Sequence, residues 1–148
     1  MGTEIERKIL VKSDFKHLAV RKIRIRQSYF CIDPERVIRL RITDEKGQLT
    51  FKSVPVGNSF ARKEWEFEIP LTEAEEMLDI CLPGQIEKTR YIIPSGKHFF
   101  EVDVFHGKHE GLIIAELELT SESEEFERPE WLGEEVTGNP KYYNSNLI

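Results

Sequence analysis

The stretch Glu4-Ile5-Glu6-Arg7-Lys8-Ile9-Leu10, close to the start of the chain, decides the fold. It reads as a β-strand, in which alternate side chains share a face. Glu4, Glu6 and Lys8 therefore point one way, and the two isoleucines between and after them point the other way. Two carboxylates and an ammonium group on one face cannot form a hydrophobic core. They predict the wall of a site that binds a cation and an anion together.

The composition sets the class of protein. With 148 residues, 39% of them hydrophobic and 32% charged, the chain is expected to form one domain over residues 1–148. Its net charge of −6 argues against a nucleic-acid partner, whose binding surface is usually basic. Charge begins at Glu4 with no apolar signal region, and no apolar run approaches the roughly 20 residues that span a bilayer. The two cysteines, Cys31 and Cys81, lack zinc-site spacing. We expect a cytoplasmic protein with free thiols and no membrane partner.

Seven further segments show the alternation of a strand, and most are separated by short turns. They are residues 22–31, 36–43, 48–54, 62–69, 86–93, 98–106 and 112–119. Helices are expected at 15–20 and at 72–80, where Thr72 and Glu75 have the spacing of a capping box. The polar tail, 120–148, is expected to hold one or two short helices. The pattern predicts a mainly β (α+β) fold: an eight-stranded antiparallel β-barrel with a few flanking helices.

Along most of these strands one face is apolar and the other is densely charged. An ordinary sheet with one solvated face would alternate in the same way. However, one sign of charge dominates on most strands, and Glu64, Glu66 and Glu68 would repel one another unless cations faced them. This favours an inverted barrel, with apolar residues outside under helices and a charged tunnel inside. Two points stay open. The basic row of 22, 24 and 26 either extends the lining or is solvated, and Tyr29, on the same face as Gln27, lies at the tunnel mouth or in a core.

The charged face holds two sets of side chains. The acidic set is Glu4, Glu6, Asp103, Glu116 and Glu118, with the triplet at 64–68 also available. The basic set is Lys8, Arg39, Arg41, Lys52, Lys88 and Arg90. Carboxylate oxygens suit hard cations such as Mg²⁺ or Mn²⁺, and arginine and lysine bind phosphate oxygens. A ligand that needs both sets is a polyphosphate that carries a metal ion.

These residues carry a resemblance to a known family. Glu4-x-Glu6-x-Lys8 resembles the ExExK signature of the CYTH superfamily, the triphosphate tunnel metalloenzymes. The family's other elements follow in order along nearly the whole chain: Arg39-x-Arg41, Thr50-x-Lys52, Arg62-x-Glu64-x-Glu66, Lys88-x-Arg90, Glu101-x-Asp103 and Glu116-x-Glu118. The stretch 135–147 is similar to the tail of the short bacterial members.

The resemblance implies an eight-stranded antiparallel tunnel and metal-dependent hydrolysis or cyclisation of triphosphates. It implies the metal ligands Glu4, Glu6, Glu116 and Glu118, with Asp103 holding a second, catalytic metal. It implies a substrate site made of Lys8, Arg39, Arg41, Lys52, Lys88 and Arg90. We assign direct catalytic roles to Glu66, Asp103 and Lys88, although the separate roles of the three glutamates at 64–68 stay open.

The function expected from this set is metal-dependent hydrolysis of inorganic tripolyphosphate, and less selectively of nucleoside triphosphates, with Mg²⁺ or Mn²⁺ as cofactor. One alternative is a class IV-type adenylate cyclase, which needs a nucleobase pocket that no stretch provides. Another is a non-catalytic polyphosphate-binding module, which would not keep the acidic set. Thiamine triphosphatase fits a short chain of this type less well. The small-molecule triphosphate is the expected partner, and the oligomeric state stays open between a monomer and a homodimer.

Overall fold

The computed structural model describes the backbone of residues 2–55 and 61–148 and the side chains of residues 5–54 and 61–148. It contains nine strands: β1 (Gly2–Val11), β2 (Arg21–Asp33), β3 (Arg36–Ile42), β4 (Gly47–Pro55), β5 (Ala61–Ile69), β6 (Ile86–Ser95), β7 (His98–Phe105), β8 (Ile113–Leu119) and β9 (Leu132–Glu135). The eight predicted strands are all found. The ninth, β9, lies in the tail, where helix was expected.

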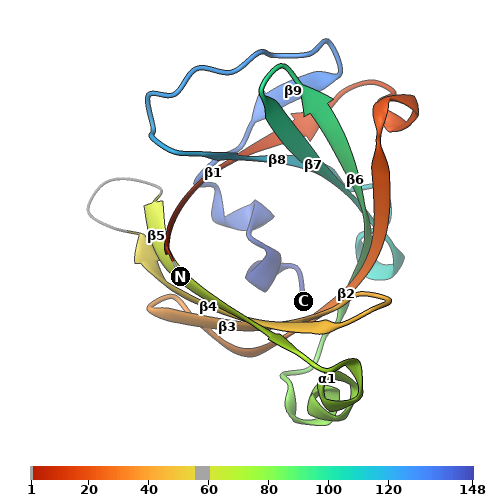
Figure 1. Cartoon of the computed structure of the whole chain (residues 1–148), viewed down its shortest axis with the longest axis vertical. Helices are drawn as coiled ribbons and strands as arrows, with labels where there is room; N and C mark the ends of the chain where they lie inside the picture. Colours follow the sequence, from red (N-terminus) through yellow and green to blue (C-terminus); the bar gives the residue numbers. More distant parts are fainter. Residues whose placement is uncertain (1, 56–60) are drawn as a thin grey trace.

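The strands form one antiparallel sheet that closes on itself (Figure 1). Their order is β5-β4-β3-β2-β6-β7-β8-β1-β9, and β5 also pairs with β1. The first eight strands therefore form a ring, which confirms the predicted antiparallel barrel. β1 closes it, because its first residues pair with β5 and its later residues with β8 and β9.

The helices are shorter than predicted. The segment 72–80 forms α1 (Leu71–Met77) and one 3₁₀ turn (Leu78–Ile80), and the segment 15–20 forms only a 3₁₀ turn at Lys16–Leu18. The predicted capping box is wrong, because the N-cap residue is Pro70 and no side chain caps the helix. Three more 3₁₀ turns lie at Gly107–His109, Pro140–Tyr142 and Asn144–Asn146. No helix in the described part of the chain is long and apolar enough to cross a membrane.

The register shows which face of each strand is inside. Glu6 lies directly opposite Glu118, and Lys8 directly opposite Glu116, so these four side chains share one face of the sheet. The same face holds the buried Lys88, Arg90 and Asp103, which confirms the predicted inversion of the barrel.

Strand β2 differs from its neighbours because its inner face is largely uncharged. Gln27 lies opposite Arg41, which places the odd-numbered residues of β2 on the inner face, with Ile25 among them. The basic row of 22, 24 and 26 therefore lies outside, where Arg26 forms an ion pair with Glu75 of α1. Of the two open alternatives for that row, the solvated one holds.

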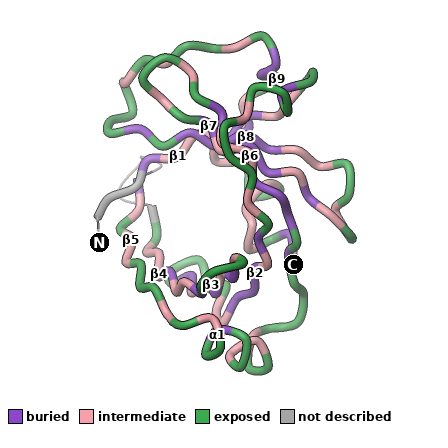
Figure 2. The backbone as a smooth tube through the Cα atoms, turned by 45° about the vertical axis from the view of Figure 1, so that its right-hand side comes forward, coloured by how far each residue is buried: buried purple, intermediate pink, exposed green. Residues whose placement is uncertain are grey.

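The apolar outer faces are covered in two places. α1 packs over β3 and β4, where Ala74 joins Leu40 in a buried cluster, and a Cβ on Gly47 would lie only 2.3 Å from the Cβ of Ala74. The irregular segment between β8 and β9 covers the other side, and its Trp131 is buried in the main core (Figure 2). Phe67 on β5 is 55% exposed, so the expected helical cover over every strand is only partly correct.

The tail after β9 returns to the barrel and packs against inner-face residues (Figure 1). Leu147 is buried with Phe105, Ile114 and Tyr29. The inside of the ring is therefore apolar where the tail packs and charged elsewhere.

An ion pair between β1 and β9 fastens this tail to the barrel. Arg7 donates from Nε and Nη2 to the two carboxylate oxygens of Glu135 at 2.5 and 2.6 Å. These two hydrogen bonds, together with one from the Thr137 hydroxyl, lower the pKa of Glu135 below its ordinary value of 4.5, although burial acts in the opposite direction.

Glu135→Gln is expected to lower the free energy of unfolding at pH 7 by about 1 kcal/mol. Because the folded-state pKa is depressed, the contribution is present above the ordinary pKa of 4.5 and is lost as the pH falls through the lowered value. Urea unfolding of both proteins should therefore show a difference at pH 7 that shrinks below pH 4.5. The exposed neighbour Glu134 provides the matched control, Glu134→Gln, and equal effects of the two changes would contradict the assignment.

Candidate active site

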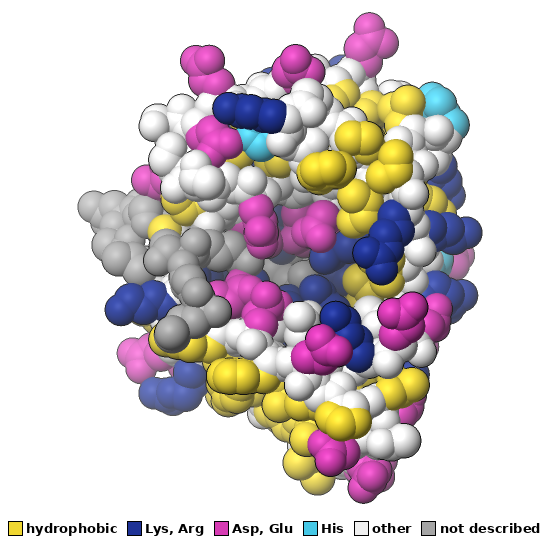
Figure 3. Space-filling model, viewed as in Figure 1, with side chains coloured by type: hydrophobic (Ala, Val, Ile, Leu, Met, Phe, Trp, Pro, Cys, Tyr) yellow, Lys and Arg dark blue, Asp and Glu magenta, His cyan; other side chains and the backbone are white. Residues whose placement is uncertain are grey.

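The centre of the ring is hollowed, and acidic and basic side chains gather around the hollow (Figure 3). A cavity there is lined by residues from β1, β2, β3, β4, β5 and β8 and from the tail. They are Glu6, Lys8, Tyr29, Val37, Arg39, Lys52, Arg62, Glu116, Thr137, Gly138, Tyr143, Asn144 and Ser145. Six strands and the tail thus contribute to one chamber.

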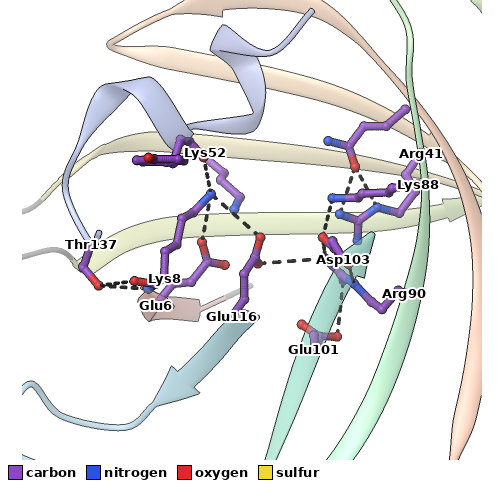
Figure 4. A network of polar contacts seen from close by, with 12 residues as sticks. Glu6, Lys8, Arg41, Lys52, Lys88, Arg90, Glu101, Asp103, Glu116 and Thr137 are labelled. Atoms are coloured by element: carbon purple, nitrogen blue, oxygen red, sulfur yellow. Dashed lines mark hydrogen bonds and ion pairs between the residues drawn. The ribbon is translucent and has the colours of Figure 1, made fainter. Parts of the chain in front are cut away.

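Lys8 occupies the centre of one charged group (Figure 4). Its Nζ lies 3.8 Å from a carboxylate oxygen of Glu6 and 3.8 Å from one of Glu116, and it donates to the carbonyl oxygen of Tyr142 at 3.1 Å. Burial alone would raise the pKa of Glu116, but Lys8, Arg90 and Lys88 outweigh it and hold that pKa well below its ordinary value. Glu116 is therefore ionised at neutral pH.

Asp103 is the centre of a second, fully buried group. Its Oδ1 accepts from Arg90 Nε at 2.7 Å, and its Oδ2 lies 2.7 Å from Lys88 Nζ and 2.9 Å from Arg90 Nη2. Arg90 also lies 3.9 Å from a carboxylate oxygen of Glu116, which links the two groups (Figure 4). Both oxygens of Asp103 are thus engaged by cations in this structure.

Burial and the neighbouring charges shift the pKa values of Asp103, Arg90 and Lys88. Burial opposes the charged form of Arg90, yet Asp103 and the nearby carboxylates raise the pKa of Arg90 well above its ordinary value. The pKa of Asp103 is lowered, because Arg90 and Lys88 outweigh the effect of burial. For Lys88 the balance is opposite: burial, with help from Arg90 and Arg41, lowers its pKa to about 8 despite Asp103. Lys88 can therefore exchange a proton near neutral pH.

The third group lies on β3, β4 and β5. Arg39 donates to the Thr50 hydroxyl at 3.1 Å, and that hydroxyl donates to Glu66 at 3.3 Å. Lys52 Nζ lies 3.6 Å from Glu64 on the neighbouring strand. Thr50 is fully buried, whereas the Glu66 side chain is 40% exposed, so Glu66 marks the solvent side of this group. Glu68 contacts Lys46 instead, at 3.4 Å on the surface, which separates it from the other two glutamates.

The predicted site residues thus divide into those the fold brings together and those it does not. The basic set lines the inside of the ring, together with Glu6, Asp103 and Glu116, and Glu118 shares that face as an exposed residue. The side chain of Glu4 lies outside the described residues, although its backbone pairs with Arg62 of β5. The periodicity of the strands was sufficient to select these positions.

The prediction missed Gln27, Arg62 and the lining residues of the tail. Gln27 is fully buried and accepts two hydrogen bonds from Arg41. Its strand gave no signal, because the two preceding inner positions are isoleucines. Arg62 lines the cavity and lies 5.4 Å above the ring of Tyr143. Its place in the alternating stretch 62–66 could have identified it. The tail residues carry no periodicity, so nothing in the sequence pattern indicated them.

The carboxylate oxygens of the acidic side chains are suitable ligands for a hard divalent cation. The Lys8 ammonium lies between the carboxylates of Glu6 and Glu116, which shows that this place accommodates positive charge. The oxygen-only donor set is the one that Mg²⁺ and Mn²⁺ prefer. Among residues 5–54 and 61–148, no three side chains of the metal-ligating type are gathered closely enough to hold an ion. A complete site would therefore need Glu4 or a movement of the side chains.

A closed β-barrel whose inside carries lysine and arginine side chains beside carboxylates has the chemistry to bind a polyanion together with a cation. The comparisons with known proteins agree. The CYTH domain family matches residues 2–146, and the chain therefore belongs to the CYTH family. Membership of this family of metalloenzymes implies a divalent metal.

Two curated relatives are similar over nearly their whole length. The inorganic triphosphatase of Acetivibrio thermocellus is 44% identical over 149 residues, which cover 100% of this chain and 94% of the relative. The inorganic triphosphatase of Nitrosomonas europaea is 36% identical over 149 residues, covering 98% and 96%. A crystal structure of an inorganic triphosphatase superposes with a TM-score of 0.69 at 33% identity, covering 97% of this chain and 96% of that one. The fold and the sequence thus lead to the same class of enzyme.

Proposed function

We propose that this protein is a metal-dependent triphosphatase that hydrolyses inorganic tripolyphosphate to pyrophosphate and phosphate inside the barrel. The observation that carries the proposal is one chamber lined by Lys8, Arg39 and Lys52 beside the carboxylates of Glu6 and Glu116. Phosphoryl transfer needs positioning and charge stabilisation more than covalent chemistry from the protein, and such a lining supplies both. The two curated relatives named inorganic triphosphatase support the same activity.

The proposed substrate-binding residues are the inward cations Lys8, Arg39, Arg41, Lys52, Lys88 and Arg90. All six have partners within the ring that keep their charged ends in place. Arg90 and Lys88 are held by Asp103, Arg41 by Gln27 and Arg39 by Thr50, and Lys8 and Lys52 face glutamates. Preorganised cations do not have to be ordered when the phosphate chain arrives.

The proposed metal ligands are Glu4, Glu6, Glu116 and Glu118, with Asp103 at a second position. Mg²⁺ or Mn²⁺ held there would neutralise charge on the phosphate oxygens. Glu66 and Lys88 are the proposed groups for orienting and deprotonating the attacking water. Glu66 lies 4.0 Å from the chamber residue Arg39 and is 40% exposed, and the lowered pKa of Lys88, about 8, suits a proton acceptor near neutral pH.

The remaining expectations concern partners and location. A net charge of −6 argues against a nucleic-acid partner. It is compatible with a small anionic substrate that is bound by the basic side chains inside the barrel. We also infer a cytoplasmic location. A homodimer stays a prediction, and the exposed apolar side chain of Phe67 on the outer face of the barrel supports it.

A substrate panel tests the proposal directly. Purified protein with Mg²⁺ or Mn²⁺ is expected to release phosphate from tripolyphosphate faster than from ATP or pyrophosphate, and to release none with a chelator present. Phosphate is measured colorimetrically and cyclic AMP by chromatography. Formation of cyclic AMP from ATP would indicate the cyclase instead. Tight binding of tripolyphosphate without turnover under either metal would indicate a binding module.

A further inference from the structure

Gln27 is a fully buried amide on the inner face of β2, between Arg41 and the chamber residue Tyr29. Arg41 lies directly opposite it on β3, and Tyr29 follows two positions later on the same face. A buried amide with four hydrogen-bonding positions is costly to leave unsatisfied. Its partners therefore determine what it does.

The orientation of this amide is fixed by Arg41. Two nitrogens of the Arg41 guanidinium, Nε and Nη2, lie 3.1 and 3.0 Å from Oε1 of Gln27. A guanidinium group can only donate, so the atom that faces it must be the oxygen and not the nitrogen. The amide nitrogen then faces the other way, and it lies 3.0 Å from the hydroxyl oxygen of Tyr29.

The direction of the Tyr29 proton follows from that geometry. An amide nitrogen only donates, so the hydroxyl oxygen of Tyr29 accepts from Gln27 and cannot give its own proton back. No other hydrogen bond of this hydroxyl is found among the described side chains. Tyr29 is 2% exposed and lines the chamber beside Arg39 and Lys52. The chamber is the space in which an acceptor for that proton can be placed.

We propose that the Tyr29 hydroxyl donates a hydrogen bond to a phosphate oxygen of the substrate, and that Gln27 is the positioning residue that directs this proton into the chamber. The inference rests on the proposed function. It adds a neutral, fully buried donor to the charged groups proposed to bind the substrate. It also gives Arg41 a second role, because Arg41 sets the amide orientation on which the tyrosine depends.

The test measures the effect of Tyr29→Phe in three backgrounds. In the unchanged protein, Tyr29→Phe is expected to raise KM for tripolyphosphate about 10-fold or more, the usual effect of losing a hydrogen bond to a charged group. In Gln27→Glu, the carboxylate still accepts hydrogen bonds from Arg41. It cannot donate to Tyr29, so the tyrosine hydroxyl donates its proton to the carboxylate and turns away from the substrate. Tyr29→Phe should then change KM less than 2-fold, as a rough limit.

Gln27→Met is the matched third background. It removes all three hydrogen bonds of the amide and leaves the hydroxyl free to turn into the chamber, so Tyr29→Phe should again raise KM several-fold. If Gln27 had a merely structural role, Gln27→Met would raise KM at least as much as Gln27→Glu does. Tyr29→Phe would then change KM by the same factor in every background. Thermal midpoints of all variants separate loss of fold from loss of binding.

Two results would overturn the inference: an unchanged KM in Tyr29→Phe alone, or an equal effect of Tyr29→Phe with Gln and with Glu at position 27. Failure of the proposed function looks different, because the unchanged protein would then release no phosphate. In that event the same three comparisons are made on the dissociation constant for tripolyphosphate by calorimetry. Should Gln27→Glu not fold, the single variant Tyr29→Phe still decides whether the hydroxyl contributes.

Discussion

Replacing Glu116 with glutamine is expected to lower metal-dependent hydrolysis of tripolyphosphate by about 100-fold or more. Glu116 is buried and ionised, and it lies within 3.9 Å of both Lys8 and Arg90. Its charge therefore acts both on a bound metal ion and on the proposed phosphate-binding cations. Glutamine keeps the shape but removes the charge that a divalent cation requires. Phosphate release is measured over a range of Mg²⁺ and Mn²⁺ concentrations.

The exposed Glu87 on the outer side of β6 provides the control. Glu87→Gln removes the same charge from the chain without touching the chamber, and its rate should equal that of the unchanged protein. A Glu116→Gln protein that keeps its fold, its rate and its metal dependence would exclude Glu116 from the metal site.

The largest effect on stability is expected at Asp103. Asp103→Ala should lower the free energy of unfolding by about 3–5 kcal/mol, because it leaves the buried Lys88 and Arg90 without their shared counter-charge. Urea unfolding measures the change. The double variant Asp103→Ala with Lys88→Met removes one of the two stranded cations and should recover part of the loss.

A loss of less than about 1 kcal/mol in Asp103→Ala would contradict this account of the cluster. It would mean that water or the remaining carboxylates screen the two cations. Substitution of the exposed Asp79 by alanine controls for removal of an aspartate as such.

Much of this site could be predicted from the sequence, because a strand repeats every two residues. Once Glu6 was placed on a charged face, the alternation assigned Arg39, Lys88 and Glu116 to charged faces without knowledge of the pairing. The pairing itself came only from the structure. The local sequence pattern does not predict that Glu6 lies opposite Glu118, because that pairing depends on how the ring closes.

The predictions that were wrong or incomplete also have physical causes. On β2 the arginines at 24 and 26 face outward and the isoleucines at 23 and 25 face inward, and the alternation is the same for either choice. Arg26 faces outward beside Glu75 of α1, a long-range partner that the sequence does not reveal. β9 was missed because its four residues, Leu132–Glu135, are too short to show a period. α1 begins at Leu71 with Pro70 as its N-cap residue, so Thr72 already lies within the helix and cannot cap it.

The closure of the ring by β1 also bears on how the protein folds. The amide of Lys8 donates to the Thr137 hydroxyl across 129 residues of chain, and β1 pairs with β5, β8 and β9. Contacts this far apart in sequence carry a high loop-closure entropy and slow down folding. During synthesis the first strand must wait until nearly the whole chain has emerged before it can pair with its last partners. The chamber therefore assembles as one of the final events, and regained activity in a refolding experiment would report the completed barrel rather than any part of it.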